Sequence, residues 1–175
     1  RAFRALVLAS QQKWDDAAAQ LAVFDTLDEP LPMFSQIIES QSLREQIALK
    51  TERLYGRKVS ADTEVTVTSG ATEALFAAIA AVVHAGDEVI MLDPCYDCYD
   101  PAVELAGGRA VHIPLRLPDF SVDWQRVKDA ITPRTRMIMT NSPHNPSGAV
   151  LEASDLETLA EIVRGTDIFV LSDEV

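Results

Sequence analysis

Two asparagines and two prolines stand close together in residues 141–148, whose sequence is Asn-Ser-Pro-His-Asn-Pro-Ser-Gly. The side-chain amides of Asn141 and Asn145 can donate hydrogen bonds to an anionic ligand. Each X-Pro step disfavours helix, so we expect the chain to leave the preceding strand as a shaped loop. Such a loop lies where open α/β sheets bind their ligands. A proline-stiffened turn with surface asparagines is the alternative.

A second turn suited to binding lies in residues 67–74, Val-Thr-Ser-Gly-Ala-Thr-Glu-Ala. The β-branched residues 65–68 predict a short strand, and the alanine-rich residues 73–85 predict a helix. The helix would have so few polar positions that we expect it to be buried between layers. Free backbone N–H groups at its start, next to small residues, suit a phosphate. A tight turn without any ligand fits the same pattern.

The only two cysteines, Cys95 and Cys98, lie in residues 93–99, Asp-Pro-Cys-Tyr-Asp-Cys-Tyr. A C-x-x-C pair can be redox-active or provide half of a zinc site. No second cysteine pair and no flanking histidine cluster completes a metal set, so this is the weaker interpretation. Two cysteines without a signal peptide predict a reducing cytoplasm.

Strands and helices alternate along the rest of the chain. Further strands are predicted at 88–92, 109–115, 136–140 and 167–171. Further helices are predicted at 17–27, 42–55, 99–106, 123–131 and 153–164. Asp123 is expected to cap the helix that follows it. This alternation predicts an α/β fold, a three-layer sandwich around a mostly parallel central sheet with right-handed crossovers.

Composition excludes several classes of protein. A chain of 175 residues with 47% hydrophobic and 24% charged residues is typical of one soluble globular domain. The formal net charge of -12 argues against nucleic acid, because no basic stripe is present to neutralise phosphates. No apolar run approaches the roughly 18 residues that a membrane span needs.

Four motifs, in order, resemble those of the fold-type I pyridoxal phosphate (PLP) aminotransferases. Residues 145–148 resemble the family's Asn-Pro-x-Gly signature, and residues 67–74 resemble its phosphate-binding turn. Residues 93–99 resemble its cofactor-stacking loop, and residues 172–175, Ser-Asp-Glu-Val, resemble its next landmark. The resemblance covers residues 42–175, the N-terminal part of the large PLP-binding domain. It is closest to the methionine and kynurenine aminotransferase branch.

The resemblance implies a role for six residues in binding PLP. Three of them, in the turn, would hold the phosphate, and an aromatic ring would stack on the pyridine ring. An asparagine would donate to the phenolic oxygen, and a carboxylate would pair with the pyridinium nitrogen. The six residues are Gly70, Ala71, Thr72, Tyr96, Asn145 and Asp173. Tyr99 is expected to be a packing aromatic, and Asn141 to shape its loop.

The implied activity is transfer of an amino group from an amino acid, sulfur-containing or aromatic, to a 2-oxo acid. The alternatives are a PLP-dependent carbon–sulfur β-lyase and a truncated, non-catalytic binding or dimerising module. The family's lysine, which forms a Schiff base with PLP, is absent, because Lys13, Lys50, Lys58 and Lys128 lie outside its motif. This chain alone is therefore expected to be inactive. The family also implies a homodimer.

Residues 1–41 match the family poorly. They carry no chemical motif, and in the family tens of residues would separate the segment 33–38 from the helix that begins at Ser42. We therefore expect the sequence to be discontinuous near residues 39–41. A natural variant with a short linker is the alternative.

Overall fold

The computed structural model describes residues 32–174, without the side chains of residues 32–40 and 42. The chain divides into two compact units, with the boundary between Ser69 and Gly70. The predicted helix at 17–27 lies outside the described residues. No helix in the described part is long and apolar enough to cross a membrane.

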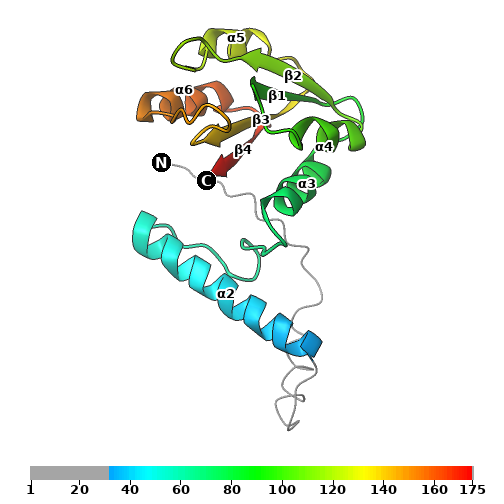
Figure 1. Cartoon of the computed structure of the whole chain (residues 1–175), viewed down its shortest axis with the longest axis vertical. Helices are drawn as coiled ribbons and strands as arrows, with labels where there is room; N and C mark the ends of the chain where they lie inside the picture. The colour runs from blue at the N-terminus through cyan, green and yellow to red at the C-terminus, as the bar shows by residue number, and fades with distance from the viewer. Residues whose placement is uncertain (1–31, 175) are drawn as a thin grey trace. The chain divides into compact units, whose positions relative to one another are not determined.

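The first unit is built on one helix, α2, which spans Pro32–Tyr55 (Figure 1). It runs without interruption across residues 39–41, and the discontinuity of the sequence expected there stays a prediction. No glycine or proline lies between Met33 and Tyr55, so nothing in the local sequence ends the helix. Two of its apolar side chains are largely exposed, Leu43 at 48% and Leu54 at 57%.

Residues 65–68 do not form the predicted strand. Their β-branched composition favours extended backbone, and Val65 is buried. A strand, however, exists only with a partner, and none of the four strands in the described part of the chain pairs with this segment.

The second unit contains a four-stranded parallel sheet in the order β2-β1-β3-β4 (Figure 1). Its strands are β1 (Glu88–Asp93), β2 (Arg109–Pro114), β3 (Thr135–Ser142) and β4 (Phe169–Glu174). All four were predicted to within a few residues. β1 and β3 are central and read as nearly continuous buried apolar runs, as expected of strands covered on both faces.

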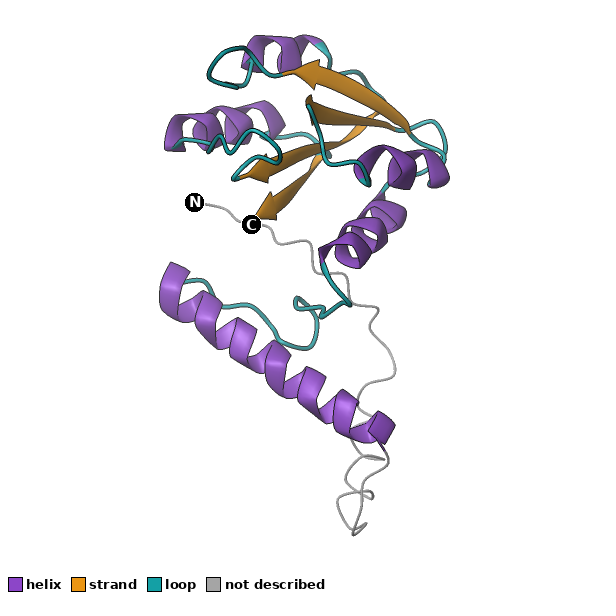
Figure 2. Ribbon diagram, viewed as in Figure 1, coloured by secondary structure: helices purple, strands orange, loops and turns teal. Residues whose placement is uncertain are grey.

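Helices cover both faces of this sheet, which confirms the predicted three-layer α/β sandwich (Figure 2). On one face, Ile90 and Ile138 pack with Val127 and Leu159 from α5 and α6. Val89 and Met91 point to the opposite face, where α3 and α4 pack against each other. The helices are α3 (Ala71–Val82), α4 (Tyr99–Leu105), α5 (Trp124–Asp129) and α6 (Ala153–Val163).

A local signal sets the start of α5, and burial distinguishes the faces of α3. The Asp123 side chain accepts the backbone N–H of Arg126, so the predicted cap of α5 is confirmed. α3 was expected to be buried between layers, and in the described structure only one of its faces is covered. It buries one face, with Leu75 and Ile79, while Phe76 is 47% exposed.

The strand order creates a topological switch point between β1 and β3. The chain leaves β1 through α4 towards β2 at the edge, then crosses back to β3 and continues outwards to β4. The connections after β1 and β3 therefore diverge, and open α/β sheets bind their ligands at the carboxyl ends of strands at such a point. This edge of the sheet carries the candidate site.

Candidate functional site

Asn141, near the end of β3, organises the loop that follows it. Its side chain is buried, its Oδ1 accepts the backbone N–H of Asn145 at 2.6 Å, and its Nδ2 donates to the Asp173 carbonyl at 3.1 Å. The prediction that Asn141 shapes the loop is confirmed. Asn145 itself is exposed, and within residues 32–174 its side-chain amide makes no hydrogen bond. The amide can therefore donate to a ligand.

Asp173 lies at the same carboxyl edge of the sheet, near the end of β4, the strand next to β3. It lies in β4 directly opposite Asn141 in the parallel register. Its Oδ2 accepts a hydrogen bond from the Tyr99 hydroxyl at 2.6 Å, while its Oδ1 has no such partner among the described residues. One carboxylate oxygen is thus engaged by the protein and the other can accept a proton donor from a ligand.

Tyr99 is more than the packing aromatic that we expected. It is 3% exposed and donates to a carboxylate 74 positions away. Its burial and this hydrogen bond raise its pKa above the ordinary value, so it stays a donor. Its ring also meets that of Tyr96 edge-on, with centroids 5.8 Å apart and planes at 85°. No local pattern in the sequence could have identified a partner so distant along the chain.

These contacts join three of the six predicted site residues. They run from Tyr96 through Tyr99 to Asp173, and from Asp173 through Asn141 to Asn145. The connected residues come from the loops after β1 and β3, from the start of α4 and from the ends of β3 and β4. All lie at the carboxyl edge, on both sides of the switch point.

The other three predicted residues begin α3. Gly70 is its N-cap, with φ 103° and ψ 169°, and Ala71 and Thr72 form its first turn. All three are exposed, and a Cβ added at Gly70 would meet nothing within 4 Å. The start of this helix is therefore open to an anion.

The C-x-x-C pair does not bring its two thiols into one metal set. Cys95 lies instead beside Asp93 and His112, with their ligand atoms all within 4.8 Å of one another. His112 contacts Asp93 Oδ1 at 2.9 Å through Nδ1 and Asp100 Oδ1 at 3.2 Å through Nε2. The hydrogen bond with Asp93 is the main cause of a raised pKa for His112. A histidine ring that contacts two carboxylates accounts for this cluster.

The thiols of Cys95 and Cys98 are unsuited to act as nucleophiles, because their pKa values are raised. Burial and the neighbouring Asp93 carboxylate raise the pKa of Cys95 to about 11. Burial also raises the pKa of Cys98. Both thiols remain protonated near neutral pH, which opposes thiolate chemistry.

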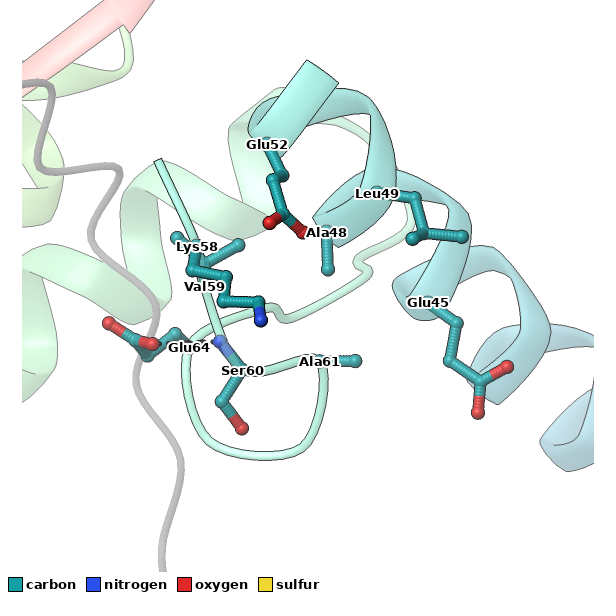
Figure 3. Close-up of a pocket in the computed structure, with 9 residues that line it drawn as sticks. All are labelled: Glu45, Ala48, Leu49, Glu52, Lys58, Val59, Ser60, Ala61 and Glu64. Carbon is teal, nitrogen blue, oxygen red and sulfur yellow. Dashed lines mark hydrogen bonds between the residues drawn. The ribbon is translucent and has the colours of Figure 1, made fainter. Parts of the chain in front are cut away.

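A hollow of ≈ 640 Å³ lies in the first unit, between α2 and the loop that follows it (Figure 3). Its lining includes Glu52, Lys58 and Ser60, and the Ser60 backbone N–H donates to Glu64 at 2.8 Å. None of the predicted site residues lines it, and its walls carry no recognisable chemical motif. We therefore place the candidate site at the sheet edge.

The family model for aminotransferase class I and II matches residues 12–175. The chain belongs to this aminotransferase family. Residues 12–41, which matched the family poorly by inspection, are included in the matched range.

Several aminotransferases are similar to this chain. A methionine aminotransferase of Escherichia coli is 53% identical over 135 residues, which make up 77% of this chain and 35% of the relative. Human kynurenine–oxoglutarate transaminase 3 is 33% identical over 167 residues, covering 90% and 36% of the two chains. The chain spans about a third of the length of these relatives.

Solved aminotransferase structures share the fold. A methionine aminotransferase from Escherichia coli superposes with a TM-score of 0.75 at 39% identity, over 96% of this chain and 52% of that chain. N-succinyldiaminopimelate aminotransferase from Mycobacterium tuberculosis gives 0.73 at 36% identity, over 96% and 43%. The predicted PLP-transferase fold is confirmed.

Members of this aminotransferase family use PLP. The donor set at the sheet edge fits that cofactor. A carboxylate with one oxygen available suits a pyridinium N–H, an exposed amide suits a phenolic oxygen, and an open helix start suits a phosphate.

Proposed function

We propose that the protein containing this chain transfers an amino group from an amino acid to a 2-oxo acid with PLP as cofactor. Family membership carries the proposal, together with the Asp173 carboxylate at the carboxyl edge of the sheet, which has one oxygen engaged and one available. The relatives named above are aminotransferases, and none of them favours the lyase alternative. PLP supplies an electron sink that stabilises negative charge at the α-carbon of the amino acid.

The residues of this chain would hold and tune the cofactor. The Asp173 carboxylate would keep the pyridine nitrogen protonated, because an adjacent anion favours the charged form of a base. The Asn145 amide would donate to the phenolic oxygen and stabilise its negative charge. The backbone N–H groups at Gly70, Ala71 and Thr72 would receive the phosphate at the positive end of α3.

Tyr96 would complete the cofactor site from the loop after β1. Its half-buried ring offers a flat face, and its edge-on contact with the buried Tyr99 restrains it. Offset stacking on the pyridine ring would hold the cofactor in plane. Sulfur-containing or aromatic amino acids are the proposed donors, consistent with the names of the two relatives. A homodimer in the cytoplasm is also part of the proposal, by likeness to the family.

The test uses the whole protein that contains this chain. Its intact mass and its absorbance spectrum with PLP show whether a lysine-bearing remainder and bound cofactor are present. Methionine, kynurenine and glutamine are then offered with a 2-oxo acid, and the oxo acid formed from each donor is measured. We expect amino transfer with at least one donor. PLP binding without amino transfer, or no PLP binding, would contradict the proposal.

Asp173→Asn gives the residue-level test. Loss of the negative charge should lower kcat by about a hundredfold or more, since charge stabilisation in a site is worth that much. Asp129→Asn, an exposed carboxylate on α5, is the matched control and should leave kcat unchanged. Equal kcat values for the two variants would contradict the assignment of Asp173 to the cofactor site.

A further inference from the structure

Three side chains with metal-ligating atoms lie together at the carboxyl end of β1. Asp93 ends that strand, Cys95 lies in the loop that follows, and His112 comes from the neighbouring strand β2. One ligand atom of each residue, an oxygen, a sulfur and a nitrogen, lies within 4.8 Å of the other two. The parallel pairing of β1 with β2 brings the histidine to the other two residues, so the sequence around the cysteines could not reveal it.

Two of these groups contact the Asp93 carboxylate directly. His112 Nδ1 lies 2.9 Å from Asp93 Oδ1, and the Cys95 thiol donates a hydrogen bond to the same carboxylate. Zinc bonds of about 2.0–2.3 Å in a tetrahedron separate the ligand atoms by about 3–4 Å. The three groups are therefore close to the spacing of a metal set, and small side-chain movements would admit a cation between them.

Asp100, in α4, holds the histidine in the orientation that a ligand needs. Its Oδ1 lies 3.2 Å from His112 Nε2. A metal-binding histidine usually donates its second ring N–H to a carboxylate, which fixes the tautomer and the direction of the ring. With its proton on Nε2, the His112 ring presents the lone pair of Nδ1 on the side where it contacts Asp93.

We propose that Asp93, Cys95 and His112 Nδ1 form a site for one zinc ion, with Asp100 as the residue that positions the histidine. Sulfur and imidazole ligands together favour Zn²⁺ over hard cations such as Mg²⁺. The thiol would lose its proton to solvent on binding, since a coordinating thiol is deprotonated. Thiolate and carboxylate then balance the charge of the divalent ion, and water would take the fourth position.

The zinc site is reachable from solvent and separate from the proposed cofactor contacts. The side chains of Asp93 and His112 are 35% and 38% exposed, so an ion has an entry path. None of the four residues is among the six assigned to PLP, so this inference does not depend on the proposed function. Because Cys95 precedes Tyr96, a bound ion would also tie the loop that carries Tyr96 to β2.

Zinc uptake by the whole, untagged protein tests the site, after any metal has been removed with a chelator. Bound Zn²⁺ is measured by equilibrium dialysis and elemental analysis, with Mg²⁺ in excess. We expect Cys95→Ser to bind one equivalent fewer than the unaltered protein, and Cys98→Ser, the matched control, to bind as much as the unaltered protein. Equal uptake by these two variants, or no uptake by the unaltered protein, would overturn the inference.

The histidine and its carboxylate partner are tested in the same way. His112→Gln should also bind one equivalent fewer, whereas His84→Gln, whose side chain is 71% exposed, should bind as much as the unaltered protein. Asp100→Asn should raise the dissociation constant of this ion about tenfold or more, as expected for a residue that orients a ligand. Zinc affinity unchanged in His112→Gln would overturn the assignment of the nitrogen ligand.

Because a variant could unfold, X-ray absorption at the zinc edge gives a test that needs no substitution. The unaltered protein is loaded with one equivalent of Zn²⁺. We expect one sulfur ligand at about 2.3 Å and nitrogen or oxygen ligands at about 2.0–2.2 Å. A ligand shell without sulfur would overturn the inference, and this result would leave the proposed amino transfer untouched.

Discussion

The Asn141 side chain donates to the Asp173 carbonyl at 3.1 Å, across the neighbouring strands β3 and β4. The same amide group accepts the Asn145 backbone N–H. One buried side chain thus sets the relative position of a loop and a carboxylate that we assign to cofactor binding. The Asn145 side chain makes no such hydrogen bonds within the described residues. Substitutions can therefore distinguish the structural role of Asn141 from the proposed binding role of Asn145.

Asn141→Ala should destabilise the protein, while Asn145→Ala should not. Asn141→Ala leaves two backbone groups without partners, at a cost of about 1–3 kcal/mol. Asn145→Ala removes an exposed amide, with an expected change within about 0.5 kcal/mol. Both should weaken PLP binding. Urea unfolding and PLP titration measure the two effects, and normal PLP affinity in Asn145→Ala would contradict its assignment.

Gly70→Ala should weaken PLP binding specifically. Its backbone has φ 103°, where a Cβ is strained, and Gly165 has φ 76° with equally open surroundings. Alanine at either position should cost about 1–3 kcal/mol of stability. Gly165 lies between α6 and β4, at the opposite edge of the sheet, and serves as the matched control.

The readout for this pair is the PLP dissociation constant at equal fractions of folded protein. We expect about a tenfold rise for Gly70→Ala, the equivalent of one lost phosphate hydrogen bond, and none for Gly165→Ala. Equal PLP affinities of the two variants would contradict the assignment of the phosphate site to the start of α3.

Glu88 anchors a buried charge network away from the site. It accepts from Thr132 at 2.7 Å, Arg109 at 2.7 Å and Arg134 at 2.6 Å. The hydrogen bond from Thr132, then that from Arg109, lowers its pKa from 4.5 to about 2. A lowered folded-state pKa means stability that is present above pH 4.5 and is lost as the pH falls towards 2.

Glu88→Gln should therefore destabilise the protein by about 2 kcal/mol at neutral pH, as charged hydrogen bonds become neutral ones. The variant should also lose part of the acid sensitivity of stability below pH 4.5. Thermal unfolding between neutral and acidic pH measures both effects. Glu104→Gln, on an exposed residue of α4, is the control. Parallel pH profiles for the Glu88 variant and the unaltered protein would contradict this account.

The 175-residue chain by itself should not bond PLP covalently. Its described lysines Lys50, Lys58 and Lys128 are all exposed, and none lies among the residues joined to Asp173. Incubation with PLP and borohydride, followed by peptide mass spectrometry, should find no stoichiometric adduct on any lysine. One specific adduct near unit occupancy would overturn this prediction.

Local sequence patterns were enough to predict the α/β architecture and the residue types of the loops. Apolar runs at β1 and β3, the Asp123 cap and the X-Pro steps act locally, through burial, capping and backbone sterics. Which side chains come into contact depends on the three-dimensional arrangement of the elements. Residues 65–68 show this, because strand propensity without a partner strand leaves extended chain.

Tyr99 is a second example of a contact that the local sequence does not predict. The sequence suggested a packing aromatic, yet its hydroxyl donates a hydrogen bond to a carboxylate 74 positions away. That contact exists because the strand order sends the chain out from β1 and back to β3 and β4, so that separate loops converge at one edge. Hydrogen-bond partners so far apart in sequence are set by sheet topology, which no local pattern encodes.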